Sequence, residues 1–329
     1  MPLILAGDVG GTKTVVAVYE ESGGVLRSIR EAVYPSRDHS SLEEILSEFL
    51  RDGPRPSFRA ACIGVAGAVF GGRSHATNLP WTLDESMLAG VSGTSQVRLV
   101  NDLEAMAYGM LNLRPDELAV LNAGGQGGRR GNMAVIAAGT GLGEATLYWD
   151  GTQHHSIGSE GGHAGFAPRT EQEIELLQYL REKFDNYVSY ERVLSGPGLS
   201  NIYQFLRDRG YGSEPEWLVR ELGQGDPNVT ITRHGLTKKV PLCADAIELF
   251  GSIYGAEAGN MALRVLAVGG VFVGGGIAPK LLPALRGGSF MEGFTDKGRF
   301  ADLLRGLEVS VSLNPHAPVL GAAYIAAQL

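Results

Sequence analysis

The sequence is poor in cysteine: Cys62 and Cys243 are the only two among 329 residues. They lie far apart in the chain, which is neither a disulfide framework nor a metal-ligand spacing. Apolar residues flank both, so we expect buried, reduced thiols. No run of about 18 apolar residues occurs, and the first residues lack the basic and apolar segments of a signal peptide. The sequence therefore predicts a cytoplasmic protein with no membrane contact.

Positive charge is also scarce. Lysine and arginine number 28 against 36 aspartates and glutamates, which gives a formal net charge of −8. A duplex-binding protein normally carries a basic stripe, and the one candidate cluster, Arg129-Arg130, is more typical of a solvated turn. We therefore expect no nucleic-acid partner. Because 44% of the residues are hydrophobic and 19% charged, the whole length can form a folded core.

The length suits two domains, and the chain contains no low-complexity linker between them. A pattern of two short strands around a Gly-Thr-rich turn occurs near the N-terminus and again after Asn112. We predict one α/β domain of residues 1–112 plus 315–329 and a second of residues 113–314. The tight crossover near Asn112 is predicted to act as a hinge.

Hydrophobic periodicity and turn residues predict the elements of both halves. Strands are expected at Leu3–Asp8, Thr14–Tyr19, Val25–Tyr34, Ala60–Ala66, Arg98–Val100, Met133–Ala138, Glu144–Trp149, Val271–Val273 and Glu308–Leu313. Helices are expected after Ser41, which with Glu44 forms a capping-box pattern, and at Asp102–Met110, Glu171–Phe184, Pro197–Arg209, Pro215–Leu222, Ala244–Leu266 and from Val319 onward.

Glycine is abundant, with 47 residues, and its clusters follow predicted strands. In the first cluster, the N–H groups of Gly10 and Gly11 can form an anion-binding nest, Thr12 adds a hydroxyl and Lys13 adds a positive charge. Asp8 at the strand end is placed to hold the water shell of Mg²⁺. A plain Gly-Gly hairpin turn is an equally good interpretation of this segment alone. It is not a Walker A loop, which needs a longer glycine spacing and a following helix.

Two further glycine clusters follow predicted strands in the same way. Gly139, Thr140 and Gly141 form a second candidate phosphate turn, and Gly274, Gly275 and Gly276 end the third cluster, where a flat adenine ring could lie against the backbone. One such cluster is weak evidence. Three clusters at strand ends in both halves indicate nucleotide binding more strongly than turns alone.

Polar side chains in three other segments suit sugar recognition, because carboxylates, amides and imidazoles can bind vicinal hydroxyl groups. Asn101-Asp102 stands between a strand and a helix, although an ordinary N-cap explains an isolated Asn-Asp pair as well. Glu160 and His163 share a glycine-rich loop, and Glu191 begins a short helix. Zinc binding by His163 is disfavoured because no cysteine is nearby. His154-His155 is expected to lie on the surface.

These segments, in this order, resemble the bacterial glucokinases of the hexokinase–actin–Hsp70 superfamily over essentially the whole chain. The motifs that carry the resemblance are Asp8-Val-Gly-Gly-Thr12, Asn101-Asp102, Gly139-Thr-Gly-Leu-Gly143, Glu160-Gly-Gly-His163, Glu191-Arg-Val-Leu-Ser-Gly-Pro-Gly198, Gly269-Gly-Val-Phe-Val-Gly-Gly-Gly-Ile277 and Asp296-Lys-Gly-Arg-Phe300. The segment from Glu191 to Gly198 is highly specific to that group.

The resemblance implies a two-domain actin-like ATPase (ribonuclease H-like) fold. Each domain would be a mixed β-sheet flanked by helices, with an interdomain cleft that closes on glucose, and the protein would be a homodimer. It also implies an ATP- and Mg²⁺-dependent glucokinase with Asp102 as catalytic base. The implied substrate-binding residues are Asn101, Asp102, Glu160, His163 and Glu191, and we add Asn78 and Gly67 to this set.

Two positions separate this sequence from nearby groups. Lys13 stands where close relatives often carry asparagine and where the neighbouring repressor–kinase group commonly has lysine, which bears on donor preference among ATP, ADP and polyphosphate. That group also carries a cysteine-rich zinc motif after its Glu-Gly-Gly-His-like segment, whereas this chain has Phe166-Ala-Pro-Arg169. The resemblance is therefore to the zinc-free glucokinases.

Three alternative functions remain to be weighed. A kinase for mannose, fructose or an N-acetylated sugar differs only in the pairing of one or two hydroxyl groups. A sugar-sensing regulator needs a helix-turn-helix ahead of the phosphate loop, and only seven residues precede Asp8. A chaperone-like ATPase of the same fold would lack the set of Glu160, His163 and Glu191.

Overall fold

The computed structural model describes residues 2–51, 57–125 and 130–329, so Arg129 of the two-residue basic cluster lies outside the described residues. The chain folds into two compact units. The first unit comprises residues 1–117, 156–159 and 314–329, and the second comprises residues 118–155 and 160–313. Among the described residues, no helix combines the length and apolarity needed to cross a membrane. The domain limits expected from the sequence stay a prediction.

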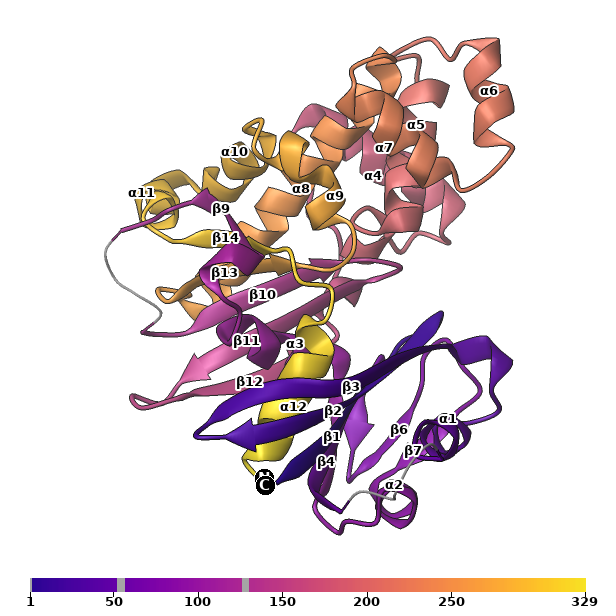
Figure 1. Cartoon of the computed structure of the whole chain (residues 1–329). Coiled ribbons are helices and arrows are strands. Elements are labelled where there is room, and N and C mark those ends of the chain that lie inside the picture. Colours follow the sequence, from indigo (N-terminus) through magenta and orange to yellow (C-terminus); the bar gives the residue numbers. More distant parts are fainter. Residues whose placement is uncertain (1, 52–56, 126–129) are drawn as a thin grey trace. The chain divides into compact units, whose positions relative to one another are not determined.

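The first unit is built on a five-stranded mixed sheet in the order β3-β2-β1-β4-β8 (Figure 1). β1 (Leu3–Val9) forms an antiparallel hairpin with β2 (Lys13–Ser22), which also pairs with β3 (Val25–Pro35). On its other side β1 is parallel to β4 (Phe58–Val65), and β4 is parallel to β8 (Val97–Asn101). Three parallel strands therefore end at the same edge of this sheet.

Side chains that alternate along the strands bury both faces of this sheet. Leu5 and Val16 pack in the cluster that contains residues of α1 (Leu42–Phe49) and α2 (Glu85–Ser92). Ile4 and Val15 pack in the cluster that contains residues of α3 (Asp102–Leu111) and α12 (Ala317–Ala327). The unit also contains a small sheet of β5 (Val69–Phe70), β6 (Arg73–His75) and β7 (Thr82–Asp84).

A six-stranded mixed sheet has the order β12-β11-β10-β13-β14-β9, and its strands β9, β10, β11, β13 and β14 belong to the second unit. Its centre is three parallel strands, β10 (Met133–Ala138), β13 (Gly270–Gly274) and β14 (Val309–Ser312), and all three are buried along their whole length. β11 pairs antiparallel with β10, and β9 pairs antiparallel with β14. The bounds of the outer strands are β9 (Leu118–Asn122), β11 (Leu142–Trp149) and β12 (His154–Ser159).

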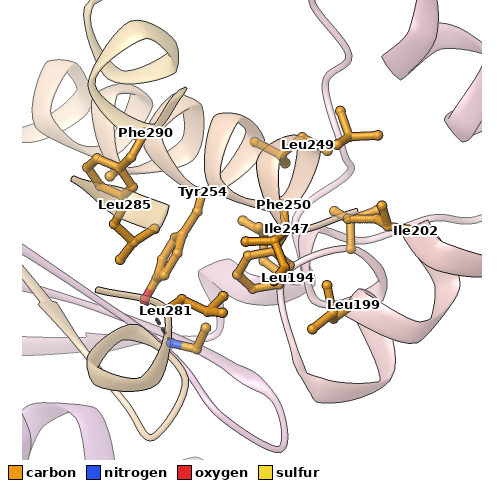
Figure 2. Close-up of a cluster of buried hydrophobic side chains, with 14 of the residues drawn as sticks. Leu194, Leu199, Ile202, Ile247, Leu249, Phe250, Tyr254, Leu281, Leu285 and Phe290 are labelled. Carbon is orange, nitrogen blue, oxygen red and sulfur yellow. Dashed lines mark hydrogen bonds between the residues drawn. The ribbon is translucent and has the colours of Figure 1, made fainter. Parts of the chain in front are cut away.

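Helix α8 (Pro241–Val265) is the central helix of the second unit, and most of its 25 residues are buried. Phe250 and Tyr254 of α8 pack in an apolar cluster with Leu194, Leu281 and Phe290 from other helices and turns (Figure 2). The other helices of this unit are α4 (Glu171–Lys183), α5 (Gly196–Asp208), α6 (Glu216–Leu222), α7 (Pro227–Leu236), α9 (Ala278–Leu285), α10 (Ser289–Thr295) and α11 (Ala301–Arg305).

The predicted mixed α/β fold is confirmed, and the long elements lie within a few residues of their predicted bounds. The sequence did not predict α2, α7, α9 to α11, β9, β12 and the small sheet, which are short or carry little hydrophobic periodicity. His154 and His155 are both partly exposed. The His154 ring lies beside Trp149, with ring centroids 4.8 Å apart, and its Nε2 lies 2.9 Å from the Gly131 carbonyl oxygen. Cys62 and Cys243 are both buried and unbridged, as predicted.

Candidate functional site

Polar residues of the first unit meet where β1, β4 and β8 end. The strand register places Asp8 opposite Gly64 and Val65 opposite Asn101. Ligands of open α/β sheets bind at the carboxyl ends of parallel strands, because backbone groups and loop side chains are exposed there. Asp8 and Asn101, which lie more than 90 positions apart in the sequence, therefore belong to one edge.

The turn after β1 is held by backbone and side-chain hydrogen bonds. The Gly10 N–H donates to the Lys13 carbonyl at 3.0 Å, and the buried Ser36 hydroxyl donates to the Gly10 carbonyl at 2.7 Å. A Cβ placed on Gly11 would lie only 2.6 Å from Cβ of Asn78. Because Gly11 has no side chain, Asn78 can pack directly against the turn. Two of the residues predicted for different ligands, Gly11 and Asn78, are direct neighbours.

Asp8 is a half-buried carboxylate at the penultimate position of β1. Burial raises the pKa of Asp8 to about 6, and the positive charge of Lys13 partly offsets this shift. Lys13 itself is the first residue of β2 and is exposed, so it lies just past the turn rather than within it. A carboxylate oxygen is a ligand type that Mg²⁺ prefers, and Mg²⁺ needs only one or two protein carboxylates when substrate phosphates supply further oxygens.

Asn101 and Asp102 stand at the junction of β8 and α3, as predicted. Asn101 is the N-cap, its Oδ1 accepting from the Leu103 N–H at 2.9 Å, while its Nδ2 donates to the Gly67 carbonyl at 3.2 Å. Glu104 completes a capping box, because the Asn101 N–H donates to its carboxylate. Asp102 is therefore the first helical residue and not the cap. Its carboxylate accepts a further hydrogen bond from Leu103 N–H at 2.9 Å.

In the second unit, the two remaining glycine turns lie side by side. β10 and β13 are parallel, with Ala137 opposite Gly274, so the turns that follow them share one edge. A Cβ on Gly275, whose φ is +78°, would lie 2.2 Å from the Ala138 carbonyl oxygen. Gly275 is thus required for close packing of the two turns. Gly139 and Gly276 differ, because a Cβ on either would meet nothing within 4 Å, which leaves room there for a ligand.

Glu191 lies directly against the Gly139–Gly141 turn. Its Oε2 accepts from the Leu142 N–H at 3.1 Å, and a Cβ on Gly141 would lie 2.4 Å from that same oxygen. The N-terminus of α5 approaches the turn from the other side, where the Gly196 N–H donates to the Gly139 carbonyl at 2.9 Å. A predicted sugar residue is therefore in contact with the end of a predicted phosphate turn.

The loop that carries Glu160 and His163 packs on the same part of the second unit. Both side chains are exposed, and the His163 N–H donates to the Glu160 carbonyl at 3.0 Å. A Cβ on the buried Gly162 would lie 2.0 Å from the carbonyl oxygen of Leu142, the residue whose N–H binds Glu191. Glu160, His163 and Glu191, predicted from separate motifs, are thus anchored to one short segment at the start of β11.

Several positioning residues escaped the sequence analysis. Ser36, which directly follows β3, bonds the first turn, and the Tyr254 hydroxyl bonds the Ala138 N–H just before the second. Tyr190 directly precedes Glu191, and its hydroxyl accepts from Asn260. The signal for Tyr190 was its place in the specific motif around Glu191; Ser36 and Tyr254 carried no signal. Within residues 2–51, 57–125 and 130–329, no cluster of three or more His, Cys, Asp or Glu side chains could hold a metal ion.

Glu144 of β11 is buried in the second unit near Glu257 of α8. Burial raises the pKa of Glu144 to about 7; the negative charge of Glu257 adds to this shift, and Arg264 lowers the value. The folded state therefore binds the Glu144 proton more tightly than the unfolded state, whose ordinary pKa is 4.5. Where a proton is bound only in the folded state, stability falls as the pH rises.

We expect the free energy of unfolding to fall by about 3 kcal/mol at most from this group as the pH rises from about 4.5 to about 7. Glu144→Gln keeps the neutral shape and should remove that fall. Thermal melts between about pH 5 and about pH 8 measure it, with the exposed Glu182→Gln as control. An identical pH dependence in wild type and Glu144→Gln would contradict the prediction.

Comparisons with known proteins agree with this geometry. The family model described as Glucokinase matches residues 5–329. A glucokinase of Nostoc punctiforme is 40% identical over 342 residues, covering all of both chains. The crystal structure of a glucokinase from an Antarctic psychrotroph has a TM-score of 0.86 at 29% identity and full coverage of both chains. A ROK family glucokinase of Streptomyces griseus, solved with glucose and AMPPNP, has a TM-score of 0.65 at 21% identity over 99% of this chain and 100% of that one.

The two mixed sheets and the paired glycine turns define a sugar kinase with the actin-like two-domain fold, as predicted. The chain belongs to the glucokinase family. The predicted identity as an ATP-dependent sugar kinase is thereby confirmed at the level of the family.

Proposed function

We propose that the protein transfers the γ-phosphoryl group of ATP to the 6-hydroxyl of D-glucose. The observation that carries the proposal is the shared edge of the first sheet. There Asp102 begins α3 directly after β8, while the Asp8–Thr12 turn follows β1, with only β4 between the two strands. A carboxylate base and a phosphate-binding turn on one edge suit phosphoryl transfer to an alcohol, which needs mainly positioning and charge stabilisation.

In the proposed reaction, Asp102 accepts the proton of the sugar 6-hydroxyl as that oxygen attacks the γ-phosphorus. A bond forms between the sugar oxygen and phosphorus, the bond from phosphorus to the β–γ bridging oxygen breaks, and ADP leaves. The Gly10-Gly11-Thr12 and Gly139–Gly141 turns would bind the phosphates through backbone N–H groups, with Gly274–Gly276 beside the nucleotide. Mg²⁺, held through water by Asp8, would supply charge neutralisation at the phosphates.

For the sugar, we propose binding by Asn101, Asp102, Asn78 and Gly67 of the first unit and by Glu160, His163 and Glu191 of the second. In the second unit, the common anchoring of Glu160, His163 and Glu191 at Leu142 supports this assignment. Membership of the zinc-free group, a homodimer, a cytoplasmic location, a role at the entry to glycolysis and a hinge near Asn112 are also proposals. The location rests on the lack of a signal segment or long apolar run, the hinge on the crossover between the two halves, and the others on the family resemblance.

A coupled assay across glucose, mannose, fructose and N-acetylglucosamine, with ATP, ADP and polyphosphate as donors, tests the function. We expect the highest kcat/KM for glucose with ATP. A higher kcat/KM for another hexose would make that hexose the substrate in place of glucose. A higher kcat/KM with another donor would indicate that Lys13 affects donor preference, since it lies beside the first turn.

We further expect glucose alone, without nucleotide, to raise the melting temperature. A ligand that binds only the folded state stabilises it by RT ln(1 + [L]/Kd), about 2.7 kcal/mol at a hundredfold excess over Kd. Glu160→Gln and Glu191→Gln should each weaken the shift, because a neutral amide replaces a charged acceptor. Glu182→Gln, on an exposed face of α4, is the control and should keep the full shift. A full melting shift in both Glu→Gln variants would show that neither carboxylate binds the sugar.

A further inference from the structure

Helix α8 carries three polar side chains in successive turns in its C-terminal half: Tyr254, Glu257 and Asn260. Tyr254 and Glu257 are completely buried and Asn260 is partly buried. Burying polar groups costs free energy unless they are hydrogen-bonded, so each is expected to have a specific partner. The partners of Tyr254 lie at the bases of the two glycine turns, and those of Glu257 and Asn260 include Tyr190 and Arg264.

The Tyr254 hydroxyl lies between the ends of β10 and β13. It accepts from the Ala138 N–H at 3.0 Å, the dashed bond in Figure 2, and approaches the Gly274 carbonyl oxygen at 3.3 Å. Ala138 immediately precedes the Gly139–Gly141 turn, and Gly274 precedes Gly275. One phenol group therefore holds both glycine turns of the second unit at their bases.

Glu257 and Asn260 hold a second phenol, that of the buried Tyr190. Asn260 Nδ2 donates to the Tyr190 hydroxyl at 3.1 Å and to Glu257 Oε2 at 2.8 Å, and Arg264 Nη1 donates to Glu257 Oε1 at 2.8 Å. Burial raises the pKa of Tyr190, and the Glu257 carboxylate adds to this through its charge and a hydrogen bond.

Tyr190 connects this network to the residues proposed for the sugar. It immediately precedes Glu191, and its N–H donates to the Ala164 carbonyl at 2.9 Å, next to His163. Loss of the hydroxyl contact would therefore loosen Glu191 and the loop that carries His163, whereas loss of the Tyr254 contact would loosen the glycine turns.

We propose that α8 positions the two halves of this site separately: Tyr190, held by Asn260 and Glu257, positions the sugar-binding Glu191, and Tyr254 positions the nucleotide-binding turns. The assignment of a sugar and a nucleotide to these halves rests on the proposed function. Neither tyrosine touches substrate in this proposal, so both are positioning residues.

The test compares three Tyr→Phe variants that each remove one hydroxyl from a buried ring. Tyr190→Phe should raise the KM for glucose by roughly twofold to tenfold, the range of one hydrogen bond, and leave the KM for ATP unchanged. Tyr254→Phe should raise the KM for ATP by a similar factor and leave that for glucose unchanged. Tyr203→Phe is the matched control, because its hydroxyl donates to Glu214 at 2.7 Å away from both turns, and should change neither KM.

A double variant separates positioning from general loosening. Asn260→Ala should reproduce the effect of Tyr190→Phe, and the two together should exceed either alone by little, since both break the same contact. The inference is overturned if Tyr190→Phe raises both KM values equally, or if Tyr203→Phe matches it.

Failure of the proposed function is distinguishable from failure of this inference. A wild-type protein without activity on glucose and ATP would count against the function alone. Calorimetric titration with AMPPNP then still tests Tyr254→Phe without turnover. Equal affinity of AMPPNP for wild type and Tyr254→Phe would overturn the inference.

Discussion

Asp102→Asn is expected to lower kcat by about 10²–10⁴-fold, the usual contribution of a general base. The amide keeps the size of the carboxylate and one acceptor oxygen, so it can still accept from the Leu103 N–H, and α3 should form normally. It cannot take up the proton of the sugar hydroxyl. Steady-state kinetics measures kcat, and the glucose-dependent melting shift shows that the sugar still binds.

Glu104→Gln provides a matched control in the same helical turn. Glu104 is half-buried, and its carboxylate accepts from the Asn101 N–H, a capping interaction that glutamine also makes. Its kcat should stay near that of the wild type. Near-normal turnover of Asp102→Asn, or an equal loss of kcat in Glu104→Gln, would show that the Asp102 carboxylate is not the general base.

Gly321→Ala is expected to destabilise the first unit by about 1–3 kcal/mol or more, the usual cost of forcing extra atoms into a packed core. A Cβ on Gly321 of α12 would lie 1.7 Å from the Ala105 carbonyl oxygen of α3, and a Cβ on Gly109 of α3 would lie 1.8 Å from the Ala317 carbonyl oxygen. The two helices thus approach each other through glycines on both sides. Since both contacts are with backbone, a rotamer change cannot relieve them.

The same substitution in an open helix should act in the opposite direction. Gly90 is exposed in α2, and a Cβ there would meet nothing within 4 Å. Gly90→Ala should therefore stabilise the protein by roughly 0.5–1 kcal/mol, because alanine is the better helix former. Thermal and urea denaturation of both variants measure the difference. Gly321→Ala should also reduce activity, since α3 carries Asp102 at its first position; equal melting temperatures for the two variants would contradict the close packing.

The chemistry of the candidate site was predictable from residue types and local spacing. Asp8 after an apolar run, Asn101-Asp102 before a helical pattern and Gly139-Thr140-Gly141 between two strands are local patterns, and each lies where it was predicted. Local patterns could not show which loops become neighbours. The contacts of Gly11 with Asn78 and of Gly141 with Glu191 join segments about 50 or more positions apart. They depend on strand order, which periodicity does not encode.

The sequence by itself determined the fold class and the glycine turns, and it supplied Asp102 as the proposed base and the carboxylates proposed for the sugar, because these follow from short-range patterning and from motifs of specific order. Only the tertiary structure decided why particular glycines are required. Gly11, Gly141 and Gly275 each make room for another part of the same unit, whereas Gly139 and Gly276 leave open space. The tertiary structure also decided which groups Ser36, Tyr190 and Tyr254 contact. A buried hydroxyl forms a hydrogen bond with a polar group that the fold brings within about 3 Å of it. That distance depends on packing and not on neighbours in the sequence.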